Sequence, residues 1–369
     1  MIYLDNAATT FPKPRTVINS VNDCLNNYCG NPSRSSHILS MKASEAVYEA
    51  REAVAELVGI NDPERVVFTM NATYALNLAI KTSIKSKCHV LISDIEHNSV
   101  VRTVEKLKST LGVECSRFDT DNIEASITSL LRADTAAIIS TLASNVTGKR
   151  VSLELLSVIA KKHGLILITD AAQLIGHEAV NLKKYPCNVL CAPGHKALFG
   201  IQGCGFAIFC DEILRDSFIE GGSGSNSASP GMPDLLPERF EAGTLPTPAI
   251  AALTAGIKFL REITEPAICE KLSVLNARAR SVLDSIAGIK AYGTGPISFS
   301  YKNIPSSVIC SLLDKRGICT RGGLHCAPHA HEKLGTLDGG LVRISTSILN
   351  STKDLDELYY AIKDISRIY

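Results

Sequence analysis

Lys196 lies in sequence surroundings that suggest covalent chemistry. It belongs to the segment Cys191–Gly205 (CAPGHKALFGIQGCG), which follows an apolar run typical of a buried strand. Desolvation at such a position lowers the pKa of a lysine and favours its neutral, nucleophilic amine, so Lys196 is a candidate to form a Schiff base with a carbonyl compound. A loop lysine that pairs with a nearby carboxylate fits the segment equally well.

A second segment, LILITDAAQLIG at 165–176, ends a predicted buried strand at Asp170 and places Gln173 in the following turn. The carboxyl ends of strands in open α/β sheets face the ligand crevice, so Asp170 is placed to meet a bound molecule. Together with a Schiff-base lysine one βα unit later, this arrangement suits pyridoxal phosphate (PLP), because a carboxylate keeps the pyridine nitrogen protonated and the ring then accepts electrons. The alternative is an aspartate that only caps a helix.

Two further polar turns follow predicted strands. In Arg65–Ile80 the chain passes from a predicted strand to a predicted helix. The free backbone N–H groups at the N-terminus of that helix, together with the Thr73 hydroxyl, are candidates to bind a phosphate. An ordinary capped turn is the alternative there. In Asp94–Val100 (DIEHNSV), His97 is placed to stack on an aromatic cofactor, or else it is a surface-loop histidine.

These turns are spaced along a region of alternating helical periodicity and short apolar runs, from about residue 40 to 210. That alternation predicts an α/β fold with a mostly parallel sheet, and the nearly continuous hydrophobicity of the runs indicates strands buried on both faces. An amphipathic helix is predicted over Met41–Val58. The predicted strands are Arg65–Thr69, Val90–Ser93, Ala137–Leu142, Leu165–Thr169, Val189–Ala192 and Gly205–Phe209.

The pattern changes at Gly221–Gly231 (GGSGSNSASPG), which predicts a mobile surface loop. Beyond it, the periodicity restarts as a smaller α+β domain. Its predicted elements are helices at Ala249–Ile263, Glu265–Ile286 and Ser306–Lys315, strands at Gly295–Tyr301 and Leu341–Ser347, and a last helix opened by a capping box from Ser351 to Asp354. We expect a large domain over 15–248, with 1–14 and 249–369 forming the small domain.

Composition excludes several classes of function. The 369 residues carry a net charge of +1 without basic blocks, so nucleic acid is not an expected partner. The longest uncharged stretch, Ala242–Ile257, is too short and too interrupted by proline to span a membrane, and we expect no cleaved leader. Twelve cysteines without a CxxC pair are typical of reduced thiols in a cytoplasmic protein.

The ordered motifs of the chain resemble the PLP-dependent cysteine desulfurase and selenocysteine lyase family, within the class V aminotransferase group. They are YLDNAATT, EHNSV, SNVTG, TDAAQ, GHK, AGTLP and RGGLHCA, and they extend from Tyr3 to about Asn350. The resemblance implies a large PLP-binding domain with a seven-stranded, mostly parallel sheet between helices. It also implies PLP as the cofactor and L-cysteine as the substrate.

Roles for individual residues follow from the same resemblance. It implies that Lys196 holds the cofactor aldehyde, that His97 stacks on the ring and acts in catalysis, and that Asp170 pairs with the ring nitrogen. The remaining implied contacts are Gln173 and Asn145 at the phenolic oxygen and the substrate, Ala72, Thr73 and His195 at the phosphate, and Arg343 at the substrate carboxylate. Thr244 is similar to the threonine that reaches the phosphate across a dimer interface, which implies a homodimer.

The reaction-specific group is expected in Thr320–Ala330 (TRGGLHCAPHA). Cys326 matches the family's persulfide cysteine, with Arg321 upstream as a substrate-side residue, and both Arg321 and His325 are expected to favour the thiolate. A competing interpretation is a zinc site built from His325, Cys326, His329 and His331. Our prediction for the site contains no metal.

Two positions depart from the family pattern: Pro193 stands where many relatives carry a phosphate-binding serine, and Ala72 also lacks a hydroxyl. The expected function is conversion of L-cysteine to L-alanine with sulfur transfer to Cys326. Selenocysteine lyase, another PLP-dependent lyase that cleaves the Cβ–S bond, and a sulfur-relay binding protein are the alternatives. The final sulfur acceptor stays open among an iron–sulfur scaffold, a thiolation protein and a small thiol.

Overall fold

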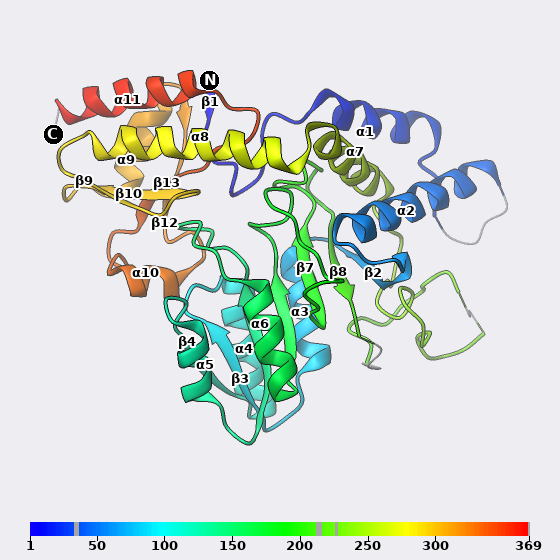
Figure 1. Ribbon diagram of the computed structural model, residues 1–369. Coiled ribbons are helices and arrows are strands. Elements are labelled where there is room, and N and C mark those ends of the chain that lie inside the picture. The colour runs from blue at the N-terminus through cyan, green and yellow to red at the C-terminus, as the bar shows by residue number, and fades with distance from the viewer. Residues whose placement is uncertain (33–36, 212–215, 226–227, 368–369) are drawn as a thin grey trace.

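The computed structural model describes residues 1–32, 37–211, 216–225 and 228–367 (Figure 1). Its central element is a seven-stranded sheet with the strand order β2-β8-β7-β6-β5-β3-β4. The strands are β2 (Val66–Thr69), β3 (His89–Ser93), β4 (Glu114–Phe118), β5 (Thr135–Thr141), β6 (Ile166–Asp170), β7 (Val189–Pro193) and β8 (Gly205–Phe209). Only β8 runs antiparallel to its neighbours β2 and β7, so the predicted mostly parallel α/β fold is confirmed.

Successive residues of these strands point into two different apolar cores, as the period of a β-strand requires. Leu91, Ile138 and Leu167 belong to one core, which contains α5 (Ile123–Leu130) and α6 (Leu153–His163). Ile92, Ile139 and Ile168 belong to the other, which contains α3 (Ala72–Ser83) and α4 (Asn98–Leu111). The sheet therefore lies between two helical layers.

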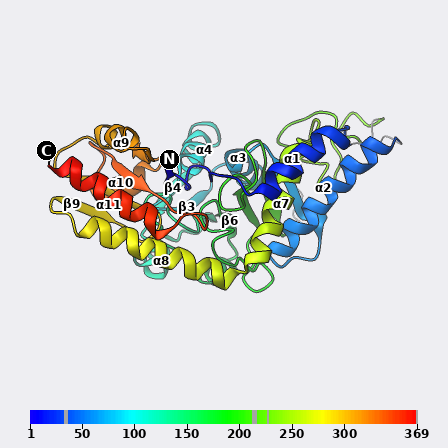
Figure 2. The same ribbon diagram turned by 90° about the horizontal axis from the view of Figure 1, so that it is seen from above.

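Three long helices complete the first core beside the sheet. They are α1 (Arg15–Asn27), α2 (Ile38–Leu57) and α7 (Thr247–Ile263), and Figure 2 shows them grouped at one end of the molecule. Residues of α7 such as Ile250 and Leu253 are fully buried in this core. The division of the domains between 248 and 249 stays a proposal, although α7, most of which lies beyond that boundary, packs in the same core as the large sheet.

The other end of the molecule is built on a four-stranded antiparallel sheet of order β12-β13-β10-β9, with a separate two-stranded pairing of β1 with β11. The strands are β1 (Ile2–Tyr3), β9 (Ile289–Tyr292), β10 (Ile297–Tyr301), β11 (Ile318–Cys319), β12 (Arg321–Gly323) and β13 (Leu341–Ile344). The helices are α8 (Glu265–Asp284), α9 (Ser306–Asp314), α10 (Pro328–Leu334) and α11 (Thr352–Ser366). A third apolar core, which includes Leu4 and Phe299, joins the first residues of the chain to this region.

Several sequence predictions need correction at the ends of elements. The strand predicted from Gly295 begins at Ile297, and the strand predicted to reach Ser347 ends at Ile344. The predicted set of strands omitted β4, whose residues are largely polar because it pairs only with β3 at the sheet edge. The predicted loop Gly221–Gly231 contains neither helix nor strand in its described part, and residues 226 and 227 lie outside the described residues.

Candidate active site

The carboxyl ends of β2, β3, β5, β6 and β7 lie at one edge of the large sheet, because these strands run in the same direction. A cavity of about 340 Å³ lies at this edge and also receives residues from the small-sheet region. It brings together all but one of the predicted site residues, namely Ala72, Thr73, His97, Asn145, Asp170, Gln173, His195, Lys196, Arg321, Cys326 and Arg343. Topology, rather than closeness in sequence, assembles this set.

Lys196 faces the cavity just beyond β7. Burial lowers the pKa of its amine to about 8, although the nearby Asp170 carboxylate acts in the opposite direction. Within the described residues the amine forms no ion pair with a carboxylate. A substantial fraction of Lys196 is therefore neutral near pH 8, as a nucleophilic lysine requires.

Asp170 is the last residue of β6, and only 4% of it is exposed. Its Oδ1 accepts a hydrogen bond from the backbone N–H of Ala172 at 2.8 Å, so the carboxylate stabilises the following turn as well as lining the cavity. Burial raises the pKa of this carboxyl. Gln173 uses its side-chain Nε2 to donate to the carbonyl of Ala7 at 2.9 Å, which connects this turn to the N-terminal segment.

Two histidines form part of the cavity wall. His97 caps α4, since its Nδ1 accepts from the backbone N–H of Ser99 at 3.1 Å. Burial lowers the pKa of both His97 and His195 to about 4, so both rings are neutral at pH 7. The buried Nδ1 of His195 has no hydrogen-bond partner among the described residues, and it is available to a polar group of a ligand.

The N-terminus of α3 forms another part of the wall. Asn71 caps this helix by accepting from the backbone N–H of Tyr74 at 3.0 Å, and the N–H groups of Ala72 and Thr73 have no acceptor within the described chain. Gly205 of β8 lies against this turn, where an added Cβ would come within 2.6 Å of the Asn71 carbonyl carbon. The free N–H groups favour an anion, as the sequence predicted for a phosphate.

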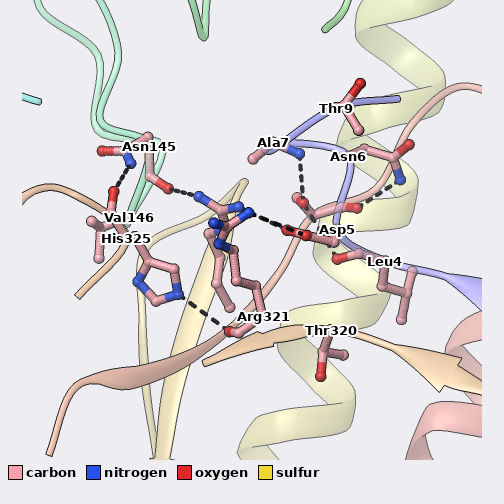
Figure 3. Close-up of polar contacts among 12 residues, drawn as sticks. Leu4, Asp5, Asn6, Ala7, Thr9, Asn145, Val146, Thr320, Arg321 and His325 are labelled. Carbon is pink, nitrogen blue, oxygen red and sulfur yellow. Dashed lines mark hydrogen bonds and ion pairs between the residues drawn. The ribbon is translucent and has the colours of Figure 1, made fainter. Parts of the chain in front are cut away.

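Arg343 of β13 is held by the N-terminal segment and by the turn that follows β5. Its Nη2 donates to Asp5 Oδ1 at 2.8 Å and its Nη1 donates to the carbonyl of Asn145 at 3.0 Å, while Arg321 lies 3.7 Å from the other Asp5 oxygen (Figure 3). Two guanidinium groups and one carboxylate leave a net positive charge, which suits a substrate carboxylate. Sequence reasoning missed Asp5, although an acid directly after the apolar MIYL was its visible signal.

Cys326 reaches the cavity on the turn between β12 and α10. His325 and Cys326 both have left-handed backbone conformations, with φ of 51° and 55°. Asn145 Nδ2 donates to the His325 carbonyl at 2.7 Å (Figure 3), and the Asn98 N–H donates to the Cys326 carbonyl at 2.7 Å. Burial lowers the pKa of His325 to about 3, so its ring is neutral at pH 7 and contributes no positive charge beside the Cys326 thiol.

Comparison with known proteins places this arrangement in a family. The model of the family described as aminotransferase class-V matches residues 2–358. The chain belongs to the class-V aminotransferase family. Probable cysteine desulfurases from Methanothermobacter thermautotrophicus and Vibrio cholerae are 29% and 28% identical to it, over 99% and 98% of this chain and 94% and 93% of their own.

Solved structures agree with this assignment. The apo structure of cysteine desulfurase from Thermococcus onnurineus NA1 has a TM-score of 0.91 and 27% identity, covering 100% of this chain and 95% of that one. The cysteine desulfurase CsdA from Escherichia coli has the same fold, with a TM-score of 0.90 at 22% identity over 99% of this chain and 94% of its own. The predicted family and fold are confirmed.

Membership in the class-V aminotransferase family implies PLP, and the residues of the cavity fit this cofactor. The partly neutral Lys196 suits an aldehyde, the buried Asp170 suits a pyridine nitrogen, and His97 offers a neutral aromatic face. The free N–H groups of Ala72 and Thr73 and the unpartnered His195 Nδ1 suit a phosphate. Ala72 and Pro193 contribute no hydroxyl, so backbone groups and Thr73 must supply these contacts.

Thr244 is the predicted site residue that lies elsewhere. It is exposed and lines a separate cavity of about 600 Å³ beside Tyr48 and Glu241. Within one chain it does not reach the Lys196 cavity, so its predicted role depends on a second subunit.

The zinc interpretation has no geometric support in the described residues. No group of three or more His, Cys, Asp or Glu side chains is arranged there to hold a metal ion. His325 and His331 instead bond to each other, with His325 Nδ1 3.4 Å from His331 Nε2.

No helix within the described ranges is long and apolar enough to cross a membrane.

Proposed function

We propose that this protein is a PLP-dependent cysteine desulfurase that converts L-cysteine to L-alanine and transfers the sulfur to Cys326. The observation that carries this proposal is the position of an exposed cysteine at the cavity that also contains Lys196 and Arg343. That cavity combines a nucleophilic thiol, a low-pKa amine and a carboxylate-binding cation. The cysteine desulfurase relatives support the same activity.

Each residue has a defined task in this proposal. Arg343, with Arg321 and Asn145, binds and orients the substrate carboxylate, and His97 covers the reacting face with a neutral ring. Bound PLP would act as the electron sink that makes the substrate Cα–H acidic. The neutral amine of Lys196 then takes the Cα proton.

Cys326 carries out the sulfur transfer. Its thiolate attacks the substrate Sγ, so that a new S–S bond forms as the Cβ–S bond breaks, and the carbon product takes up a proton to become L-alanine. The overall change is L-cysteine plus a Cys326 thiol giving L-alanine plus a Cys326 persulfide. The persulfide sulfur passes to a small thiol or an acceptor protein, and the exposure of Cys326 supports such a transfer.

The products of L-cysteine with PLP-loaded protein and a reducing thiol test this activity. We expect alanine and sulfide in equal amounts, and a Cys326-containing peptide heavier by one sulfur atom when the reducing thiol is left out. Cys326→Ser should abolish both the formation of alanine and sulfide and the added sulfur on this peptide. Cys88→Ser, which removes a thiol outside the cavity, should abolish neither. Pyruvate and ammonia would indicate an eliminating lyase, activity confined to selenocysteine would indicate a selenocysteine lyase, and no turnover would favour a binding protein.

We also infer a homodimer in which Thr244 completes the phosphate site of the other subunit. Support comes from the apolar side chains of Ile38, Leu39, Met41 and Tyr48, which α2 leaves exposed, and Tyr48 borders the cavity that contains Thr244. Mixing Lys196→Ala subunits with Thr244→Glu subunits tests this arrangement. If the two variants are inactive alone and active when mixed, the site is shared between subunits. If the mixture is also inactive, the shared site is contradicted.

A further inference from the structure

A chain of hydrogen bonds runs behind Cys326, from Thr336 through two histidines to the carbonyl of Arg321. Thr336 Oγ1 lies 2.8 Å from His331 Nδ1, His331 Nε2 lies 3.4 Å from His325 Nδ1, and His325 Nε2 lies 3.2 Å from the Arg321 carbonyl oxygen. The two rings are inclined by 21° with centroids 5.6 Å apart, so the bond between them runs close to both ring planes. His331 is completely buried on α10.

The direction of every bond in this chain follows from its last acceptor. A carbonyl oxygen can only accept, so His325 carries its hydrogen on Nε2 and presents a lone pair at Nδ1. His331 must therefore donate from Nε2, and its own Nδ1 accepts from the Thr336 hydroxyl. Both rings are neutral in this arrangement, which agrees with the lowering of their pKa values by burial.

Both nitrogens of His325 are thus engaged, and neither is available as a base for the Cys326 thiol. The ring instead anchors a turn in which His325 and Cys326 both hold left-handed backbone conformations, which residues with a side chain rarely adopt. Asn145 and Asn98 bind only the backbone carbonyls of this turn. The side chain of His325 is held by His331 and by the Arg321 carbonyl.

The helix that carries His331 is itself fixed to the large sheet. The Lys333 ammonium lies 2.6 Å from carboxylate oxygens of both Asp94 and Asp119, which follow β3 and β4, and Glu332 pairs with Arg117 of β4. His331 therefore connects the turn that carries Cys326 to a support outside the small sheet.

We propose that His331, with Thr336, is a positioning residue for Cys326 that acts by fixing the ring of His325. The inference rests on the proposed function only in naming Cys326 as the sulfur acceptor. It assigns His331 its main effect on sulfur transfer rather than on the binding of L-cysteine, because the guanidinium of Arg343 is hydrogen-bonded by Asp5 and Asn145 and not by the histidine pair.

The test compares His331→Phe with His329→Phe in PLP-loaded protein. His329 lies on the same helix, but it makes no hydrogen bond in the described structure through its buried Nδ1 and is not part of the chain to Arg321. We expect His331→Phe to slow single-turnover persulfide formation at least tenfold with a less than threefold change in the KM for L-cysteine, and to speed amide hydrogen exchange at 324–327 at least threefold. His329→Phe should change neither quantity.

Two substitutions of Thr336 provide a less disruptive test in case His331→Phe fails to fold. Thr336→Val removes the hydroxyl donor at nearly constant volume and should slow persulfide formation about threefold, a loss that Thr336→Ser should restore. Persulfide formation and exchange at parental rates in both His331→Phe and Thr336→Val would overturn the proposal, as would equal effects of His331→Phe and His329→Phe. If the parent protein forms no persulfide, the proposed function fails, while the exchange comparison still decides whether His331 positions the turn.

Discussion

Asp5 and Arg343 join opposite ends of the chain at the candidate active site, with Asp5 Oδ1 2.8 Å from Arg343 Nη2. Only 2% of Arg343 is exposed, and its Nε has no hydrogen-bond partner among the described residues. Asp5 and the Asn145 carbonyl fix the guanidinium plane by taking one donor from each terminal nitrogen. The fork of the guanidinium retains further donors for a substrate carboxylate.

Arg343→Lys should therefore raise the KM for L-cysteine at least tenfold, with a smaller effect on kcat. A single ammonium would be occupied by Asp5 and cannot reproduce the bidentate geometry of a guanidinium. Steady-state kinetics on PLP-loaded protein measure the effect, and Arg316→Lys, at an exposed arginine outside the cavity, serves as the control. An unchanged KM would remove Arg343 from the substrate site.

The contact between Asp5 and Arg343 also shows where sequence reasoning reached its limit. Buried strands such as Gly205–Phe209 were predictable because continuous hydrophobicity identifies them, and Asp170 and Lys196 were recognisable because one ends such a strand and the other comes soon after one. The partner of Arg343 lies 338 residues away in sequence, and no local pattern encodes that pairing.

The turn that carries Cys326 was understood only in part, for a similar reason. The spacing of His325, His329 and His331 suggested a set of metal ligands. Spacing does not determine the direction in which each ring nitrogen points, and that direction decides whether the rings bind a metal or bond to each other. The short strand β12, with only 3 residues, has no periodicity to detect, so the partners of Arg321 were not foreseen. Thr244 was recognised by resemblance alone, because its sequence surroundings contain no strand end that would direct it toward the Lys196 cavity.

Covalent capture of PLP by the cofactor-free protein should depend on pH through Lys196. Its pKa of about 8, lowered from 10.5 by burial, means that the neutral amine accumulates as the pH rises through 8. The rate, measured by borohydride trapping, should therefore level off near pH 9, whereas a free lysine derivative should still be accelerating. Asp170→Asn should move the profile to lower pH, because the Asp170 carboxylate stabilises the charged amine. A midpoint near 10.5 in the parent protein would contradict the desolvated site.

Gly205→Ala should weaken PLP binding at least tenfold by disturbing the N-terminus of α3. An added Cβ would lie 2.7 Å from Asn71 Cα and 2.9 Å from the Ala72 nitrogen, so the turn that presents the free N–H groups has to shift. Equilibrium dialysis with PLP measures the effect. Gly339→Ala, where nothing lies within 4 Å of the added carbon, is the matched control, and equal affinities in the two variants would contradict a phosphate seat at this turn.

Arg51 and Glu241 form a buried ion pair that fixes the segment leading to Thr244. Both side chains are 7% exposed, Arg51 Nη1 lies 2.9 Å from Glu241 Oε1, and the same oxygen accepts from the backbone N–H of Phe68 at 2.6 Å. Arg51→Met leaves the Glu241 carboxylate buried without its partner and should cost about 3–5 kcal/mol of unfolding free energy.

The double variant Arg51→Met/Glu241→Gln should be more stable than Arg51→Met alone, because a neutral amide no longer leaves a buried charge and its oxygen still accepts from the Phe68 N–H. Urea unfolding of the single and double variants checks this prediction. If Arg51→Met and the double variant are equally stable, replacing the Glu241 carboxylate by an amide has recovered no unfolding free energy. The unpaired carboxylate is then not the cause of the instability of Arg51→Met.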